Sequence, residues 1–192
     1  VSQHGDAVVC LLCVHSELLK NYKDIKFVSL DFSDNFKIAM EELNEQIQSL
    51  LKEDPKVCLA ASSLGGFIAM LLSIKYDLKV ALVNPCLYPC KFVRDNNYVG
   101  TTLKNFDTGH EFKIEESDLE YLEEQEALLP KFNLKNASVF LQAGDEVLDY
   151  TYALKFFMRG GVGGFSLKDG GSHGYDDFEE EVGKIVEFFK KG

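Results

Sequence analysis

Three polar residues that could carry out chemistry together are Ser63, Asp145 and His173, which lie far apart in the chain. A serine hydroxyl is a weak nucleophile unless a histidine accepts its proton and an acidic residue orients that histidine. These residue types therefore indicate nucleophilic attack on a carbonyl carbon, provided that the fold brings the three side chains to one place.

The serine lies in the stretch "CLAASSLGGF", residues 58–67. Ala61-Ser62-Ser63-Leu64-Gly65 fits the pattern G-x-S-x-G with alanine in the first small position, a pattern typical of a strained strand-to-helix turn that exposes a serine hydroxyl. Small residues are needed there because the strand and helix backbones approach closely. Choosing Ser62 instead would put a leucine at the last small position, so the pattern favours Ser63.

The histidine and the acid follow in the order that this turn predicts, first the acid and then the histidine. His173 lies in the glycine-rich stretch "DGGSHGYDDFEE", and the stretch "GDEVLDY" offers Asp145, Glu146 and Asp149. Asp145 comes directly after an expected strand and its glycine. Asp149 is better explained as the N-cap of the following helix. We therefore expect Asp145 to orient His173.

The elements that must position these residues alternate between short apolar runs and longer amphipathic runs. The expected strands cover Ile25–Phe32, Lys56–Ser62, Lys79–Val83, Ala137–Gln142 and Phe165–Lys168. The expected helices cover Asn35–Glu53, Gly65–Tyr76, Asp149–Met158 and Tyr175–Lys191. This alternation predicts an α/β fold with a mostly parallel sheet and helices on both faces. Each candidate residue follows a strand, so all three should meet at the carboxyl edge of the sheet, where such folds bind ligands.

The alternation stops at about residues 86–135, a stretch with scattered aromatic residues and an acidic run at Glu115–Glu126. We refer to it as the insert. The insert begins where the third expected strand ends, so it should lie above the carboxyl edge and act as a cap over the site. A length of 192 residues suits one domain over residues 1–192 that includes this insert.

Composition excludes several other classes of function. A net charge of −11 without a basic cluster argues against nucleic-acid binding. The longest apolar run, Ala7–Val14, is too short to span a bilayer. The cysteines lie in apolar or proline-bounded stretches, which is typical of a reducing cytoplasm and disfavours a zinc site at Cys10-x-x-Cys13 and Cys86-x-x-x-Cys90. We expect no metal.

Four stretches together, "ASSLGGF", "VNPCLYP", "GDEVLDY" and "GGSHGYDDFE", resemble the small YqiA-type bacterial esterases, a branch of the α/β-hydrolase fold. The resemblance covers roughly Lys56 to the C-terminus and is diffuse from Ile25. It implies a cytoplasmic serine hydrolase without a cofactor that acts on carboxylic esters or acyl thioesters. Ser63, Asp145 and His173 match the catalytic positions of that family, and the insert matches its short cap.

The oxyanion of such a reaction needs backbone N–H donors. The first expected donor is the N–H of Leu64, at the start of the helix. For the second donor the sequence leaves two alternatives, because the N-terminus departs from the His-Gly pattern of the family. One is His4-Gly5, followed by Asp6. The other takes Ala7–Val14 as the strand, with His15-Ser16 in place of His-Gly.

The sequence therefore predicts an esterase or thioesterase with a small-molecule substrate and a Ser63–His173–Asp145 triad. A protein of another class, an α/β-hydrolase-like binding or regulatory protein with impaired catalysis, is the alternative that the atypical N-terminus leaves open. The sequence predicts neither the acyl group of the substrate nor the oligomeric state.

Overall fold

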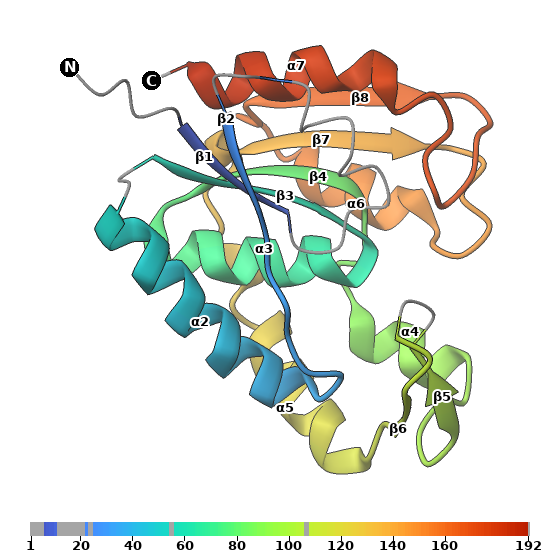
Figure 1. Cartoon of the computed structure of the whole chain (residues 1–192). Helices are drawn as coiled ribbons and strands as arrows, with labels where there is room; N and C mark the ends of the chain where they lie inside the picture. Colours follow the sequence, from blue (N-terminus) through green and yellow to red (C-terminus); the bar gives the residue numbers. More distant parts are fainter. Residues whose placement is uncertain (1–5, 11–21, 23–24, 54–55, 106–107, 192) are drawn as a thin grey trace.

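The computed structural model describes residues 6–10, 22, 25–53, 56–105 and 108–191. Its centre is a parallel sheet with the strand order β2-β1-β3-β4-β7-β8 (Figure 1). These strands are β1 (Asp6–Cys10), β2 (Ile25–Ser29), β3 (Val57–Ser62), β4 (Lys79–Pro85), β7 (Ala137–Gln142) and β8 (Gly164–Lys168). The predicted α/β fold with a parallel sheet is confirmed, and β1 lies inside the sheet between β2 and β3.

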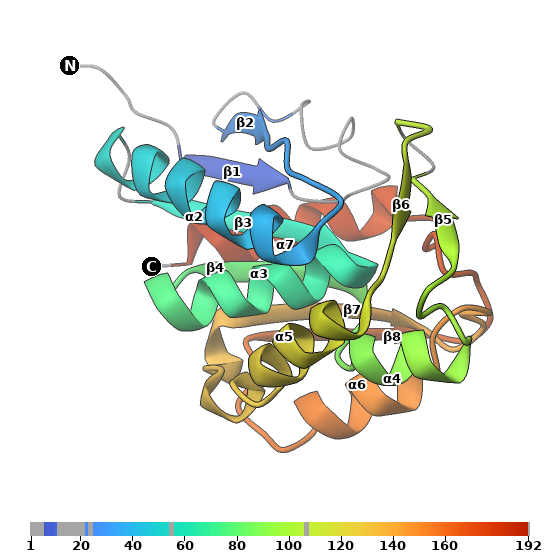
Figure 2. The ribbon, with the colours of Figure 1, turned by 90° about the horizontal axis from the view of Figure 1, so that it is seen from below.

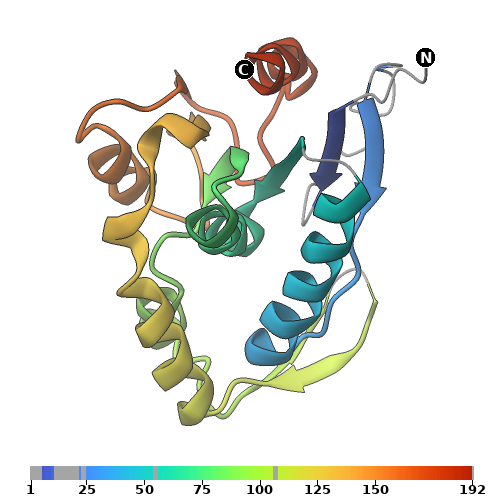
Figure 3. The same cartoon turned by 90° about the vertical axis from the view of Figure 1, so that its left-hand side faces the viewer.

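Helices cover both faces of the sheet. They are α2 (Phe36–Glu53), α3 (Ser63–Tyr76), α4 (Pro89–Asp95), α5 (Glu116–Glu126), α6 (Tyr150–Phe157) and α7 (Glu179–Lys190). Figure 3 shows α7, in red at the top, apart from α2 and α3. The side chains of the central strands alternate accordingly. Leu59 and Leu82 pack with α2, α3 and α6, whereas Ala60 and Val83 pack with α7. Because both faces are covered, the strands are apolar at nearly every position.

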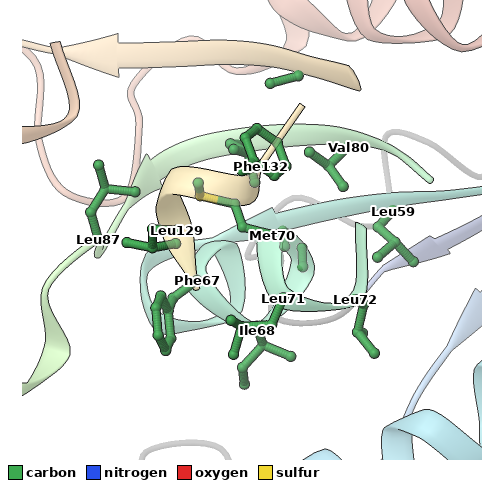
Figure 4. Packing of buried hydrophobic residues seen from close by; sticks show 14 of the residues in the cluster. Leu59, Phe67, Ile68, Met70, Leu71, Leu72, Val80, Leu87, Leu129 and Phe132 are labelled. Atoms are coloured by element: carbon green, nitrogen blue, oxygen red, sulfur yellow. The ribbon is translucent and has the colours of Figure 1, made fainter. Parts of the chain in front are cut away.

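Helix α3 is buried along most of its length, from Gly65 to Ser73, so it has no polar face. The sheet lies on one side of it, and α2 and the insert cover the other sides. Figure 4 shows this cluster of apolar side chains from the sheet, from α3 and from the insert. It includes Leu59, Phe67, Ile68, Met70, Leu71, Leu72, Val80, Leu87, Leu129 and Phe132. This packing fixes the first turn of α3, which carries Ser63.

The insert contains α4, the hairpin of β5 (Thr102–Lys104) and β6 (Glu111–Lys113), α5, and two short 3-10 turns at Leu129–Lys131 and Leu134–Asn136. Figure 2 shows α4 and the hairpin on the side to which the arrowheads of β1 and β7 point. The insert therefore reaches the carboxyl edge of the sheet.

The last helix begins later than its periodicity indicates. The sequence predicts a helix from Tyr175, but α7 begins at Glu179. Tyr175 and Asp177 have φ angles of 64° and 56°, in the left-handed region that a right-handed helix cannot contain. Residues 175–178 belong instead to the loop that carries His173.

Candidate active site

Ser63 occupies a strained turn between β3 and α3. Ser62 is still extended, with φ −119° and ψ 160°, and Ser63 then takes a φ of 51° as the helix begins. A left-handed φ in a serine costs about 1 to 2 kcal/mol, and such strain is concentrated at functional sites. The structure places this strain on Ser63 and not on Ser62, which is the register expected from the small residues around it.

Small residues also prove necessary around this turn. A Cβ added to Gly66 would lie 2.8 Å from Cβ of Pro85, the last residue of β4. The N–H of Cys86 donates a hydrogen bond of 2.9 Å to the carbonyl oxygen of Ser63. The end of β4 therefore packs against the Ser63 turn and is hydrogen-bonded to it.

His173 contacts both other candidate residues. Its Nε2 lies 3.0 Å from Oγ of Ser63. Its Nδ1 lies 3.0 Å and 2.9 Å from the two carboxylate oxygens of Asp145. The Asp145 side chain is 1% exposed and the His173 side chain 22% exposed. The structure thus brings together all three residues singled out by the sequence, at distances that allow proton transfer from the hydroxyl to the imidazole.

The loop after β7 gives each of its three carboxylates a different partner. Oδ1 of Asp145 accepts hydrogen bonds from the N–H groups of Val147 and Leu148, at 2.9 and 2.8 Å, so its orientation is fixed. Glu146 accepts from the backbone N–H of His173 at 3.0 Å. Asp149 accepts from the N–H of Thr151 at 2.9 Å and caps α6, as expected.

The first expected donor to the oxyanion, the N–H of Leu64, belongs to the first turn of α3, where backbone N–H groups have no partner within the helix.

The two candidates for the second oxyanion donor, His4-Gly5 and His15-Ser16, lie outside the described residues. Ala7 pairs with Val57 at the start of β3, and Cys10 pairs with Ala60 near its end. Asp6 is therefore at the amino edge of the sheet. Of the two alternatives, the one with a strand that begins near Ala7 matches β1, whose described residues are Asp6–Cys10.

Two buried polar residues near His173 were missed in the sequence. Asn84 and Gln142 are each 2% exposed and lie near the carboxyl ends of β4 and β7. Both form hydrogen bonds with the loop that carries His173. The signal that could have revealed them is an amide side chain at the end of an apolar strand, a position where a buried polar group needs partners.

A pocket of about 310 Å³ lies between α4 and the start of α6, and its lining residues are sequence neighbours of the site rather than Ser63, Asp145 or His173 themselves. Its walls include Tyr88, Phe92 and Tyr152, and the rings of Tyr88 and Tyr152 meet edge to face at 5.8 Å. Pro85 and Cys86 connect the pocket to the Ser63 turn, while Val147 and Leu148 connect it to Asp145.

The thiols next to this pocket are not activated. Burial, with a smaller contribution from the charge of Glu126, raises the pKa of Cys86 to about 12. The same two causes raise the pKa of Cys90 to about 12.

Within the part of the chain that the structure describes, no group of three or more His, Cys, Asp or Glu side chains is arranged to hold a metal ion. No described helix combines the length and the apolar character needed to cross a membrane.

The fold recurs in known esterases. Est1E from Butyrivibrio proteoclasticus aligns with 98% of this chain and 88% of its own at 17% identity, with a TM-score of 0.75. A structure of Est1E with ferulic acid bound aligns with 98% of this chain and 89% of its own at 15% identity, with a TM-score of 0.71. The esterase domain of a Rhodothermus marinus protein aligns with 95% of this chain and 83% of its own at 17% identity, with a TM-score of 0.64. At these identities the similarity shows the α/β-hydrolase fold.

A comparison with protein families matches residues 14–190 to the Uncharacterised protein family UPF0227, which is the YqiA family. This match spans nearly all of the chain, including the segments that carry Ser63, Asp145 and His173. The chain therefore belongs to the YqiA family, UPF0227, as the motifs in its sequence indicated.

Proposed function

We propose that the protein is a serine hydrolase that cleaves carboxylic esters or acyl thioesters. The observation that carries this proposal is the chain of contacts from Ser63 Oγ through His173 to the Asp145 carboxylate. A nucleophile, a base and an orienting acid in this order are the requirements for acyl transfer through a covalent intermediate. Membership of an esterase family supports the same reaction.

In the first half of the proposed reaction, Ser63 Oγ attacks the carbonyl carbon while His173 Nε2 accepts the hydroxyl proton. The tetrahedral intermediate then collapses, the bond to the alcohol or thiol breaks, and His173 returns the proton to that leaving group. The product of this half is an ester between Ser63 and the acyl group. Asp145 keeps the Nδ1 proton of His173 directed towards itself and stabilises the imidazolium.

In the second half, water repeats the attack on the acyl-enzyme. His173 accepts a proton from the water, and the returned proton restores the Ser63 hydroxyl as the carboxylic acid leaves. In both halves the oxyanion accepts a hydrogen bond from the N–H of Leu64. The helix dipole of α3 strengthens that bond. Such a donor contributes about 3 kcal/mol to the stability of the transition state.

The pocket between α4 and α6 supports a substrate with an aromatic group that also carries polar atoms, because polar and charged side chains line it beside the aromatic ones: Lys91, Asp95, Asn96 and Asp149. Three aromatic side chains line the pocket, those of Tyr88, Phe92 and Tyr152. Aromatic rings prefer edge-to-face contacts, as between Tyr88 and Tyr152, and these side chains offer the same contact to an aromatic group of a substrate. Est1E, which shares the fold, binds ferulic acid, an aromatic carboxylic acid of the kind that hydrolysis of an aromatic ester would release. We propose that the insert, about residues 86–135 within one domain, is the cap that forms the wall of this pocket through α4.

From the family resemblance we also expect a cytoplasmic enzyme that needs no cofactor. The alternative, a binding or regulatory protein with impaired catalysis, rests on the atypical N-terminus, where both candidates for the second oxyanion donor lie outside the described residues. The contact of Ser63 with His173 supports the enzyme over this alternative.

The proposal is tested by turnover of aryl and alkyl esters and of the matching acyl thioesters. We expect hydrolysis to the free acid by the wild type and no measurable turnover by Ser63→Ala. The variant should unfold at nearly the same temperature, because it loses only one partly exposed hydroxyl. Turnover by Ser63→Ala at the wild-type rate would contradict the assignment. A folded wild type that binds these substrates without cleaving them would favour the binding protein.

A further inference from the structure

His173 lies on a loop whose backbone has little regular hydrogen bonding of its own. Between β8 and α7, Gly170 and Gly171 have φ angles of 69° and 79°, and Tyr175 has one of 64°. Left-handed residues at this density prevent a strand or a helix from forming. The position of the imidazole must therefore be fixed by contacts from outside the loop.

One such contact comes from Asn84, near the end of β4. Its side-chain Nδ2 donates to the carbonyl oxygens of both Ser172 and His173, each at 3.1 Å. Its Oδ1 accepts from the backbone N–H of Gln142 at 3.0 Å. Asn84 itself has a φ of 40°, in a region that asparagine tolerates better than most residues. A single buried amide thus joins β4, β7 and the His173 loop.

A second contact comes from the side chain of Gln142 at the end of β7, in addition to the bonds of His173 with Asp145 and Glu146 described above. Its Oε1 accepts from the N–H groups of Ser172 and Asp176, at 3.0 and 2.8 Å. Its Nε2 donates to the carbonyl oxygen of Asp176 at 2.9 Å. A Cβ at Gly171 would overlap this amide, so the loop needs glycine at the point where Gln142 enters it. The two amides therefore form hydrogen bonds with the loop backbone before His173, at Ser172, and after it, at Asp176.

We propose that Asn84 and Gln142 are positioning residues that hold His173 Nε2 within hydrogen-bonding distance of Ser63. This inference rests on the proposed serine-hydrolase function. Among the described residues, the side-chain amides of Asn84 and Gln142 bond to the loop and not to Ser63 or the Asp145 carboxylate, so each amide acts on the reaction through the loop. The backbone carbonyl oxygen of Gln142 also accepts from the N–H of Asp145 at 3.3 Å, a bond that a change of the Gln142 side chain leaves in place. Buried amides whose donors and acceptors are paired resist displacement, because each broken bond leaves a buried polar group without a partner. A reacting group displaced by about 1 Å can lose about 100-fold in rate.

The test uses isosteric changes that remove a donor without removing volume. Asn84→Asp keeps the acceptor for Gln142 N–H but turns a carboxylate oxygen towards two carbonyl oxygens. Gln142→Glu keeps the acceptor for Ser172 and Asp176 but loses the donor to Asp176. Asn44→Asp is the control for the chemical change, because the half-buried Asn44 on α2 also donates to a backbone carbonyl, that of Met40. Its Oδ1 accepts from Lys75 and Tyr76 at the far end of α3 from Ser63, and an aspartate keeps those acceptors.

Steady-state kinetics on one ester, the thermal unfolding temperature and the proton NMR spectrum are measured for all three variants. We expect Asn84→Asp and Gln142→Glu to lower kcat about 10- to 100-fold with KM changed less than about threefold. Asn44→Asp should stay within about twofold of the wild type in both constants. In folded Asn84→Asp and Gln142→Glu, the low-field signal of the His173 Nδ1 proton bound to Asp145 should broaden or shift.

Two results would overturn the inference. One is a folded Asn84→Asp or Gln142→Glu protein with wild-type kcat and an unchanged His173 signal. The other is an equal loss of kcat in Asn44→Asp, which would reveal a general effect of stability. If the wild type has no turnover that depends on Ser63, the proposed function fails instead. The His173 signal then still decides whether the two amides position the imidazole.

Discussion

Gly66 in the first turn of α3 and Pro85 at the end of β4 lie so close that a methyl group on Gly66 would sit 2.8 Å from the Pro85 Cβ. The backbone Cα of Pro85 would be 3.1 Å from the same methyl group. This close approach lets the N–H of Cys86 reach the carbonyl oxygen of Ser63. The geometry of the Ser63 turn therefore depends on the absence of a side chain at position 66.

We predict that Gly66→Ala destabilises the protein by about 1 to 3 kcal/mol, since the added methyl forces α3 away from β4. Activity should fall as well, because Ser63 moves with the helix. The matched control is Gly183→Ala in α7, where, among the described residues, an added Cβ comes within 4.0 Å of the Tyr22 hydroxyl alone. That change should stabilise the protein by about 0.5 to 1 kcal/mol. Denaturant unfolding measures both, and a Gly66→Ala protein as stable as the wild type would refute the close contact.

The pocket gives a prediction on substrate preference. Tyr152 is exposed at 40% and forms the edge-to-face pair with Tyr88. An aromatic contact contributes about 0.5 to 1.5 kcal/mol, which corresponds to about 2- to 13-fold in kcat/KM. Tyr152→Ala should lose this factor on an ester with an aromatic group next to the scissile bond, and much less on an acetyl ester of the same alcohol.

Tyr152→Phe is the control for that comparison, because it keeps the ring and removes only the hydroxyl. It should retain the preference for the aromatic ester. Equal losses on both esters in Tyr152→Ala would mean that the pocket does not bind the aromatic group.

A buried carboxylate on the opposite face of the sheet predicts how stability depends on pH. The Glu181 side chain is 0% exposed and lies 2.7 Å from Lys184 Nζ and 3.3 Å from Lys168 Nζ. Burial alone would raise the pKa of this carboxyl, but hydrogen bonds and charge from Lys184 and Lys168 outweigh it and lower the pKa below its ordinary 4.5. The ionised carboxylate therefore stabilises the fold above about pH 4.5, and this stability is lost as the pH falls through the folded-state pKa.

We predict that Glu181→Gln lowers the free energy of unfolding at pH 7, and that its difference from the wild type shrinks below pH 4.5. Glu187→Gln serves as the control, because its ion pair with Lys191 is mostly exposed and contributes little. Denaturant unfolding at several pH values checks this. A Glu181→Gln deficit that does not change with pH would show that the carboxylate charge is not what stabilises the fold.

The parts of the molecule that local patterns determine could be predicted from the sequence. Strands β3, β4 and β7 are apolar runs that end at recognisable turns, and the Ser63 turn is defined by small residues within five positions. The start of α7 could not be predicted in this way. Its apolar periodicity continues back to Tyr175, whereas the left-handed φ angles at Tyr175 and Asp177 depend on how the loop packs.

The roles of Asn84 and Gln142 were beyond the sequence for a related reason. Asn84 bonds with backbone atoms 88 and 89 positions further along the chain, and Gln142 with backbone atoms 30 and 34 positions away. An amide at the end of an apolar strand indicates that these side chains need partners, but backbone partners have no residue identity, so the sequence does not indicate which atoms they are. The pairing becomes visible only when the ends of β4 and β7 lie next to the loop.

The most direct test of the account is labelling with a fluorophosphonate, which reacts with an activated serine and leaves a covalent adduct that mass spectrometry can locate. We predict stoichiometric modification of Ser63 in the wild type, and none in His173→Ala, whose Ser63 hydroxyl has no base. Modification of a different serine, or labelling of Ser63 at the same rate in His173→Ala, would contradict the proposed triad.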